Sequence, residues 1–431
     1  MTIVEFYDKN AIENIAGALI CKPERVVLVG GNAKQMNKSK ALYSAVLQKK
    51  GIDTAIECVP VKKNNLQNAI SVLTEVIETY GGCVFDITGG EDFYLVALGI
   101  LMERYKGKIQ CHRFNFRDDT LNDCDADGNV CATGSFDISI EDNININGGE
   151  MVTDDTLEMY TYPWDFNEDF LQDIEIMWYI CKDDCKAWNL HVDTMGTAAE
   201  RFCEDGGLTV TYDRDTLAEI RSLDGDKYKC STIIMNELAR YGLIHSVSLG
   251  NTVSYTFKNE QIKKSLTVAG QALELIVAKR MMELKDKDGQ PLYHDVKVGV
   301  VIDWDGDDET EYFRTVNEID VIAMKGVIPI FISCKNGNFD AGELYKLNSV
   351  AGRFVKKYAK NILVSTELEK LGEKGDYIRS RMEDMGIVSV ENIDAVSDEK
   401  LNKILSTLHS ASANINSNNI NNANFNNYKR R

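Results

Sequence analysis

The stretch Asn317–Lys335, with the sequence NEIDVIAMKGVIPIFISCK, contains two apolar, β-branched runs separated by a short turn. Such runs predict two neighbouring strands, Glu318–Met324 and Ile328–Ser333, that pair as a hairpin. Asp320 lies in the first strand, and Lys335 follows the end of the second. The pairing therefore predicts that a carboxylate and an ammonium group meet at one edge of a sheet.

A carboxylate and an ammonium group in this arrangement suit the hydrolysis of a phosphodiester. Hard divalent cations bind carboxylate oxygen, and positive charge is needed where the attacking hydroxide and the pentavalent intermediate develop. Upstream, Glu274 lies on a helix predicted from about Leu266 to Leu284, from which its side chain can reach the same edge. The three side chains are thus candidate catalytic residues of one site. The alternative is an ordinary hairpin that carries surface charges.

These residues resemble the PD-(D/E)XK nuclease superfamily, whose motif combines a helix glutamate, a strand aspartate and (E/S)-x-K. The resemblance implies that Glu274 and Asp320 ligate Mg²⁺ or Mn²⁺, helped by the backbone carbonyl of Cys334. It also implies that Lys335 orients the attacking water and stabilises the developing charge. The departure is Ser333, where many members have a carboxylate. One direct metal ligand is therefore missing, and the number of metal ions stays open.

The order of the predicted elements around the motif agrees with this superfamily. A further strand is predicted at Lys297–Trp304, ahead of the motif strands, and a helix at Ala341–Tyr358 follows them. That helix and the residue just beyond it offer basic side chains for a phosphate-binding stripe: Lys346, Arg353, Lys356, Lys357 and Lys360. The segment 261–411 is therefore predicted to be a nuclease domain of the PD-(D/E)XK type.

Residues 1–110 alternate strand and helix patterns. Short apolar runs such as Arg25–Val29 and Cys83–Ile87 alternate with amphipathic stretches such as Leu66–Tyr80. Strands that alternate with helices of about 10–15 residues imply right-handed βαβ units and a parallel sheet covered on both faces. The fold class is therefore predicted to be α/β, with a Rossmann-like N-terminal domain.

Two glycine-rich turns follow strands in this region, Gly30-Gly31-Asn32 and Thr88-Gly89-Gly90-Glu91. In a parallel sheet both lie at the carboxyl edge, where ligands bind, and N–H groups at the start of the next helix can hold a phosphate. The first turn lacks the G-x-G-x-x-G spacing of a dinucleotide site. The two turns are therefore candidates for another phosphate-bearing ligand, and simple tight turns are the alternative.

The layout of residues 1 to about 150 resembles the CRISPR-associated Rossmann fold (CARF) domain, including the Thr88–Glu91 turn and the stretch Glu141–Asn143. Fused to the nuclease motif, the whole chain resembles the CRISPR ancillary nucleases of type III systems. The resemblance implies a homodimer that binds a cyclic oligoadenylate across its two-fold axis, with cyclic tetra-adenylate as the expected ring. The implied ligand-binding residues are Gly30, Gly31, Asn32, Thr88, Gly89, Gly90 and Glu91.

The middle of the chain carries nearly all of the net charge of −19. Residues 111–205 hold 23 acidic and 5 basic residues and look polar and irregular, whereas the parts on either side are close to neutral. A helix at Ile233–Ala239 and a strand at Val253–Phe257 then predict a winged-helix-like connector. The expected divisions are 1–150 (CARF), 151–260 (acidic connector), 261–411 (nuclease) and an asparagine-rich tail, 412–431, too poor in apolar residues to bury a core and expected to be disordered.

Several other patterns in the sequence indicate where in the cell the protein is expected. No run of about 18 apolar residues predicts a transmembrane helix, and Met1–Phe6 lacks the basic and apolar regions of a signal peptide. The 11 cysteines show no paired spacing and are expected to be reduced thiols. A cytoplasmic protein without a membrane partner is the resulting expectation.

Other acidic and cysteine-bearing stretches make weaker candidates for metal sites. Asp123–Gly128 resembles the start of an EF-hand loop but lacks the glutamate required at the twelfth position. Cys181 and Cys185 lack a second ligand pair for zinc. Asp303 or Asp305 could still contact a metal ion near the nuclease motif.

These features predict a homodimeric, ligand-activated endonuclease that uses Mg²⁺ or Mn²⁺ to cleave DNA, RNA or both. The alternative is a ligand-responsive transcription regulator in which residues 206–260 grip a duplex and the nuclease-like domain is inactive. A helix that binds DNA is expected to be basic, whereas Ile233–Arg240 contains a single basic residue. The nuclease is therefore the favoured hypothesis.

Overall fold

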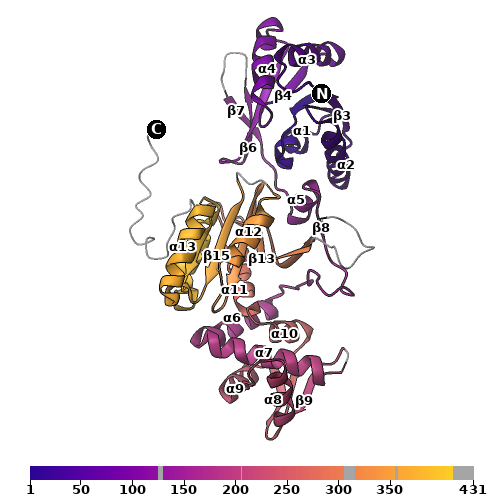
Figure 1. Cartoon of the computed structure of the whole chain (residues 1–431). Helices are drawn as coiled ribbons and strands as arrows, with labels where there is room; N and C mark the ends of the chain where they lie inside the picture. The colour runs from indigo at the N-terminus through magenta and orange to yellow at the C-terminus, as the bar shows by residue number, and fades with distance from the viewer. Residues whose placement is uncertain (125–129, 205, 305–315, 355–357, 411–431) are drawn as a thin grey trace.

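The structure, a computed structural model, describes residues 1–124, 130–204, 206–304, 316–354 and 358–410. Figure 1 shows an elongated molecule with the N-terminal domain at one end, a second sheet in the middle and a mainly helical unit at the other end. The predictions for Asp305, Lys356, Lys357, the tail and most of the EF-hand-like stretch lie outside the described residues. None of the helices within these ranges is long and apolar enough to cross a membrane.

The N-terminal domain is Rossmann-like, as predicted. Its sheet has the order β3-β2-β1-β4-β5-β6-β7, in which β1 to β5 run parallel and the last two strands are antiparallel. The strands are β1 (Thr2–Phe6), β2 (Arg25–Gly30), β3 (Ala55–Pro60), β4 (Cys83–Asp86), β5 (Gln110–Asn115), β6 (Thr120–Cys124) and β7 (Val130–Gly134). The helices are η1 (Ala11–Asn14), α1 (Ala16–Cys21), α2 (Ala33–Lys49), α3 (Leu66–Tyr80) and α4 (Asp92–Arg104).

Helix α2 begins at Ala33, well before the predicted start at Ala41. Asn32 caps it, because its side-chain oxygen accepts a hydrogen bond from the N–H of Gln35 at 3.2 Å. The first turns of α2 are largely polar and exposed, so they lack the hydrophobic periodicity on which the sequence prediction depended.

The central sheet has the order β16-β15-β14-β13-β12-β8. Strands β14, β15 and β16 run parallel, and the remaining neighbours are antiparallel. The strands are β8 (Glu150–Met151), β12 (Asp295–Asp303), β13 (Val316–Lys325), β14 (Ile328–Lys335), β15 (Lys360–Ser365) and β16 (Val388–Glu391). The accompanying helices are α11 (Gln271–Glu283), α12 (Gly342–Ala351), η2 (Leu368–Leu371), α13 (Glu373–Met385), η3 (Ile393–Ala395), α14 (Asp398–Leu405) and η4 (Leu408–Ser410).

Two helices of this domain are shorter than predicted. The helix expected from Leu266 starts at Gln271. Gly270, just before it, adopts a φ of 92° in the left-handed region, so the helix cannot extend back through this residue. The helix expected to run from Ala341 to Tyr358 ends at Ala351. The predicted strands agree closely with β12, β13 and β14.

The acidic segment 111–205 is far more regular than its composition suggested. It contains α5 (Ile140–Ile146) and two long helices, α6 (Glu168–Asp183) and α7 (Cys185–Phe202). Asn167 and Asp184 cap the two long helices by accepting backbone hydrogen bonds at 2.9 Å. Apolar residues on one face of each helix are buried, so the carboxylates that dominate the composition lie mostly on the other face. The expectation of an irregular segment was wrong.

The connector has winged-helix topology, which agrees with the predicted fold class. Its sheet has the order β10-β11-β9, and β10 and β11 form the antiparallel wing. The elements after α7 are β9 (Thr209–Asp213), α8 (Arg214–Leu223), α9 (Thr232–Arg240), β10 (Ile244–Leu249), β11 (Thr252–Phe257) and α10 (Glu260–Ser265).

The N-terminal domain and the central sheet share one apolar core. Buried residues from α5, such as Ile144, pack in the same cluster as Ile302 of β12 and Phe331 of β14. The N–H of Ile140 also donates to the carboxylate of Asp295 at 2.8 Å. The two domains are therefore in direct contact through α5.

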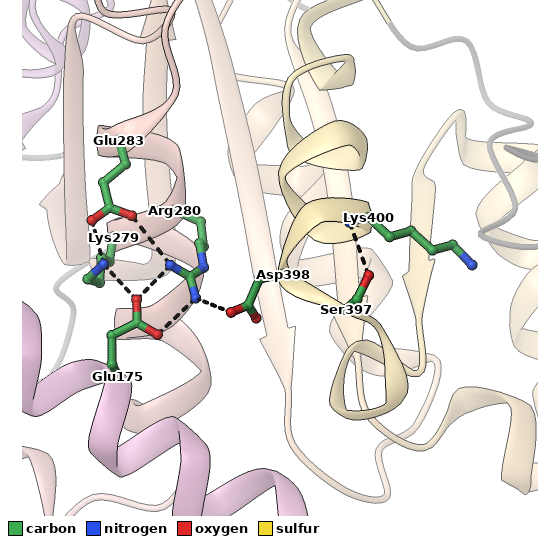
Figure 2. Close-up of polar contacts among 7 residues, drawn as sticks. All are labelled: Glu175, Lys279, Arg280, Glu283, Ser397, Asp398 and Lys400. Carbon is green, nitrogen blue, oxygen red and sulfur yellow. Dashed lines mark hydrogen bonds and ion pairs between the residues drawn. The ribbon is translucent and has the colours of Figure 1, made fainter.

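Helix α11 is held to its neighbours by a network of ion pairs (Figure 2). Arg280 contacts both carboxylate oxygens of Glu175 on α6, at 2.6 and 2.8 Å, and Asp398 on α14 at 3.1 Å. Lys279 pairs with Glu175 at 2.6 Å and also with Glu283. Lys279 and Arg280 are both buried, so their charges depend on these partners. The network fixes the helix that carries Glu274.

Replacing Glu175 with glutamine is expected to lower the free energy of unfolding by about 1–3 kcal/mol, because it leaves two buried cations short of a partner. The measurement is urea-induced unfolding of the full chain. The matched control is Glu237→Gln, which removes an exposed ion pair with Arg240 and should change the free energy by less than about 1 kcal/mol. Equal losses in the two variants would contradict this role for Glu175.

Candidate functional site

Asp320 and Lys335 lie close together on the neighbouring strands β13 and β14. The last pair of the strand register is Val321 with Ile332, so Asp320 and Ser333 come directly after it. Asp320 Oδ2 accepts a hydrogen bond from the backbone N–H of Cys334 at 2.6 Å and another from Ser333 Oγ at 3.2 Å. Lys335 Nζ lies 3.6 Å from the same oxygen. The structure therefore brings together the three motif side chains that the sequence identified on these strands.

The ammonium group of Lys335 is held between two carboxylates. Its second partner is Glu343 on α12, at 2.9 Å, and Glu343 also pairs with the exposed Lys346 at 2.7 Å. Burial opposes the charge of Lys335, but Asp320 and Glu343 outweigh burial and raise the pKa of Lys335. The lysine therefore stays protonated near neutral pH and carries a fixed positive charge at the C-terminal end of β14, inside the sheet and not at its edge as predicted.

Glu274 lies in the first turn of α11, within the electrostatic reach of this pair. Its carboxylate accepts a hydrogen bond from the side chain of Gln271 at 2.9 Å. Burial and then the nearby charges of Asp320 and Glu318 raise the pKa of Glu274 well above its usual range, with a smaller opposing effect from Lys335. The predicted helix glutamate and strand aspartate are thus parts of one charge cluster.

Glu318 is a member of this cluster that the sequence prediction missed. Its side chain is exposed on one side, yet the groups packed around it and the charge of Asp320 raise its pKa. The signal was present in the sequence, because residues two apart on a strand point to the same face, as Glu318 and Asp320 do. Glu343, which positions Lys335, had no such local signal, since it comes from another element.

The three carboxyl groups of this cluster suit a divalent cation by their chemistry, although their oxygen atoms do not all lie within 4.8 Å of one another. Glu274, Glu318 and Asp320 bring negative charges together at a partly buried place, where each raises the cost of ionising its neighbours. A cation bound between them would relieve that repulsion. Carboxylate oxygens are hard donors, which Mg²⁺ and Mn²⁺ prefer. The carbonyl of Cys334, another predicted ligand, belongs to a residue whose N–H contacts Asp320 and whose thiol is buried.

Asp303 lies elsewhere on the same sheet. It is the last residue of β12, paired with Val316, whereas Gly299 is the residue of β12 that faces Asp320. Four residues of strand correspond to about 13 Å. Asp303 is therefore offset from Asp320, although only two residues separate it from Val301, the partner of Glu318. Asp305 lies outside the described residues.

The first glycine-rich turn is tightly packed on one side and exposed on the other. A side chain at Gly31 would lie 2.8 Å from Lys63 Cγ, so the glycine allows the lysine side chain to cross the turn. Asn32 is exposed and caps α2. The turn thus presents a helix N-terminus and a lysine at the carboxyl edge of the sheet.

The second glycine-rich turn is held by hydrogen bonds to the strands around it. The N–H of Thr88 donates to Asp86 Oδ1 at 2.7 Å, and the hydroxyl of Thr88 accepts from the N–H of Phe114 at 2.7 Å. Gly90 adopts a φ of 100° and packs directly on Phe6. The turn ends at the exposed Glu91, which precedes α4. Thr88 and Gly90 therefore have structural roles as well as their predicted place near a ligand.

The two turns lie at the same edge of the N-terminal sheet. Their strands, β2 and β4, both neighbour β1, so the turns are about 10 Å apart. Tyr94, from the helix after the second turn, is buried, and its hydroxyl has no hydrogen-bond partner among the described residues. A side chain at Gly31 would lie 3.5 Å from this hydroxyl. Lys63 and Tyr94 thus join the predicted residues at this edge, and neither had a sequence motif to mark it.

Two weaker candidates from the sequence, the cysteine pair for zinc and the α9 helix for DNA, have side chains that are already engaged within the protein. The thiols of Cys181 and Cys185 are buried in the core of the connector. Arg240, the basic residue of α9, lies at the end of the helix and pairs with Glu237 at 3.3 Å.

Comparisons with known proteins identify the fold. No protein-family model matches the chain, and no curated protein matches its sequence significantly. Among solved structures, protein VC1899 from Vibrio cholerae is similar with a TM-score of 0.69 and 18% identity, over 96% of this chain and 99% of that one. Can2 from Sulfobacillus thermosulfidooxidans, solved in complex with cyclic tetra-adenylate, is similar with a TM-score of 0.63 and 13% identity, over 95% and 97% of the two chains. At these identities the likeness establishes a shared fold over nearly the whole chain.

The raised pKa of Glu274 leads to a pH-dependent stability. In the metal-free protein the folded state retains the Glu274 proton at pH values where the unfolded chain has lost it, so stability should fall as the pH rises. Melting temperatures in a chelator, at about pH 6 and about pH 8, should therefore differ less in Glu274→Gln than in the wild type.

Added Mn²⁺ should stabilise the wild type more at the higher pH, because metal ligands must be deprotonated. Glu399→Gln, a substitution at an exposed position of α14, is the control and should behave as the wild type. A wild-type pH dependence that persists unchanged in Glu274→Gln would show that this carboxylate does not carry the effect.

Proposed function

We propose that the protein is a metal-dependent endonuclease of the CRISPR type III ancillary class, activated by a cyclic oligoadenylate, with cyclic tetra-adenylate as the activator. The observation that carries the proposal is the charge cluster where β14 ends beside β13, in which Asp320 pairs with the ammonium of Lys335 and Glu274 lies within electrostatic reach of both. The substrate is DNA, RNA or both. The fold shared with Can2 supports the proposal.

Glu274, Asp320 and Glu318 would hold the cation, which is Mg²⁺ or Mn²⁺ on the chemistry of its donors. When bound, such a cation supplies Lewis-acid activation of the phosphodiester. Asp320 is placed for this role by Ser333 and the N–H of Cys334, which hold one of its oxygens at the strand edge. Ser333 therefore acts on the metal ligand and need not be a ligand itself.

Lys335 would contribute the fixed positive charge of the reaction. Its pairing with Asp320 and Glu343 restrains the ammonium at the end of β14, where it can orient the attacking water and stabilise negative charge on the phosphate oxygens. The raised pKa of Lys335 means that it cannot act as a general base near neutral pH. Its role is therefore electrostatic.

The activator would bind at the carboxyl edge of the N-terminal sheet. The backbone of Gly30–Asn32 and of Thr88–Glu91 offers N–H groups at the starts of α2 and α4, and Lys63 adds a positive charge for a phosphate. Can2, which has a similar fold, was solved with cyclic tetra-adenylate bound. These features support a cyclic, multiply phosphorylated ligand.

A homodimer is part of the proposal. Helix α4 exposes Phe93 and Val96, at 41% and 52%, one turn apart along the helix. An exposed apolar stripe beside a ligand edge is suited to pairing with the same stripe of a second copy. The ligand would then contact both copies.

The N-terminal domain also contacts the turn of the β13–β14 hairpin, which carries Asp320 and Lys335. Gly326, at the turn between β13 and β14, packs on the side chain of Asp119, and its carbonyl accepts from the N–H of Ile138 at 3.2 Å. The same hairpin carries Asp320, about 20 Å away along the strand. A ligand that favours one arrangement of the N-terminal domain could therefore bias the placement of the hairpin, provided that its affinity differs between arrangements.

The transcription-regulator alternative gains no support from the connector. Its α9 offers Arg240 as a basic side chain, and this is already paired with Glu237. The helix also exposes Ile233, at 77%. A groove-binding helix would instead present unpaired cations to the phosphates.

Asp320→Asn and Lys335→Ala are expected to reduce cleavage by on the order of a hundredfold or more, since each removes charge on which the transition state depends. The assay uses single- and double-stranded DNA and RNA with Mn²⁺ and cyclic tetra-adenylate. Lys370→Ala, which removes an exposed lysine paired with Asp394, is the matched control and should cleave normally.

Calorimetric titration of both variants with cyclic tetra-adenylate should show an affinity within about 1–3 kcal/mol of the wild type, the range of typical coupling between sites. Cleavage retained in Lys335→Ala would refute the catalytic assignment. Loss of ligand binding together with cleavage, in a folded variant, would refute the separation of the two sites.

Lys63→Ala is expected to weaken cyclic tetra-adenylate binding by about tenfold, equivalent to about 1.4 kcal/mol, because one phosphate loses its cation. Lys108→Ala is the control, since Lys108 is exposed and precedes β5 at the opposite edge of the sheet. Equal affinities of Lys63→Ala and the wild type would place the ligand elsewhere.

A further inference from the structure

The N-terminal sheet buries three ionisable side chains next to one another. Glu5 of β1 pairs in register with Asp86 of β4, and Asp86 pairs with His112 of β5. Residues in register on adjacent strands point to the same face, so the three side chains form a row across the sheet. Each is 1% exposed. Neither the nuclease site nor the ligand edge uses this row.

The three side chains converge beneath Gly17 of α1. One side-chain atom from each lies within 4.8 Å of the others. A Cβ on Gly17 would be 2.8 Å from Asp86 Oδ2, 2.9 Å from His112 Nε2 and 3.0 Å from Glu5 Oε1. Any other residue at position 17 would therefore fill the space that these atoms face. The glycine leaves that space open.

The atoms of this cluster are poorly satisfied by each other. His112 Nε2 and Asp86 Oδ2 are 3.0 Å apart, yet neither makes a hydrogen bond of good geometry with any described residue, and Glu5 Oε1 is likewise without a partner. Buried polar atoms without partners are costly and rare in proteins. Their lone pairs are thus available to a common, electron-poor partner.

The cluster brings two carboxyl groups and an imidazole together in a buried place. Buried charged groups must be paired or neutralised, because burial removes them from water. Two solutions neutralise such a cluster: shared protons or a metal cation.

We propose that Glu5, Asp86 and His112 bind a divalent transition-metal ion, and that Zn²⁺ matches the donor set best. Two carboxylate oxygens and an imidazole nitrogen are typical zinc ligands, at about 2.0–2.2 Å. Cys21 follows Gly17 by one helical turn on the same face of α1. It lies outside the group of three, so its side chain would have to turn toward the ion to supply a thiolate as the fourth ligand of a tetrahedral site.

The proposed ion has a structural role in the ligand-sensing domain. Asp86 uses its other oxygen, Oδ1, to accept the N–H of Thr88 at 2.7 Å. One carboxylate would therefore connect the ion to the Thr88–Glu91 turn and fix the orientation of that turn. The ion would also join α1 to three strands of the sheet.

The test is metal analysis of the full chain in the Asp320→Asn background, which weakens the nuclease site so that its metal is not counted. After incubation with Zn²⁺ and dialysis against metal-free buffer, about one equivalent of zinc per chain should remain. Glu5→Gln and His112→Asn should each retain less than about a tenth of that amount. His245→Asn, at an exposed histidine of the connector, is the matched control and should retain all of it.

Gly17→Ala tests whether the open space beneath Gly17 holds the ion. The added methyl group would occupy the position between the ligand atoms, so the variant should lose its zinc. Gly82→Ala is its control, since a Cβ there would meet nothing within 4 Å. Replacement of zinc by Co²⁺ should give the visible absorption of a tetrahedral site and a thiolate-to-cobalt charge-transfer band. Cys21→Ser should lose that band.

The outcomes separate the alternatives. Wild-type and Asp320→Asn proteins that retain no zinc and show no cobalt spectrum would overturn the proposal in favour of a proton-sharing cluster. Zinc retained by both Glu5→Gln and His112→Asn would place the ion at other residues, which also overturns it. A charge-transfer band that survives in Cys21→Ser would remove the thiolate from the site. Because cleavage is not the readout, failure of the proposed nuclease activity would not affect these results.

Discussion

The hydrogen bond from the N–H of Cys334 to the carboxylate of Asp320, at 2.6 Å, is the contact on which the candidate nuclease site depends. It joins β13 to β14 just beyond the last regular pair, Val321 with Ile332, and it holds Asp320 Oδ2 3.6 Å from Lys335 Nζ. An aspartate without this donor would turn to solvent or pair with the nearest cation alone. Glu274 and Glu343 each have a partner as well, the side chain of Gln271 and the ammonium of Lys335.

The position of this site also depends on packing far from it. Helix α11 can present Glu274 because Lys279 and Arg280, deeper in the same helix, are held by carboxylates from α6 and α14. The hairpin that carries Asp320 is supported at its turn by Asp119 of the N-terminal domain. Burial and the nearby Asp137 raise the pKa of Asp119 to about 6, so this contact is a titratable link between the two domains.

The two charge clusters of the chain illustrate different uses of carboxylates. The cluster around Asp320 lies where β14 ends beside β13, is partly exposed and contains only oxygen donors and a lysine. The row formed by Glu5, Asp86 and His112 is closed under α1 and includes a nitrogen donor. Open oxygen sites suit exchangeable hard cations, whereas closed sites with nitrogen and sulfur suit retained structural ions. The difference in accessibility, more than the count of charges, separates the two proposals.

The sequence by itself determined the features that depend on short-range pattern. Strand and helix periodicities predicted the Rossmann-like sheet and the hairpin of Asp320, Ser333 and Lys335, because alternation and spacing follow from local backbone geometry. Only the tertiary structure decided which distant residues meet. Glu343 reaches Lys335 from another element, Lys63 crosses Gly31, and Glu5, Asp86 and His112 align only through the strand order and register. Long-range register depends on the packing of the whole core, which leaves no mark at a fixed spacing in the chain.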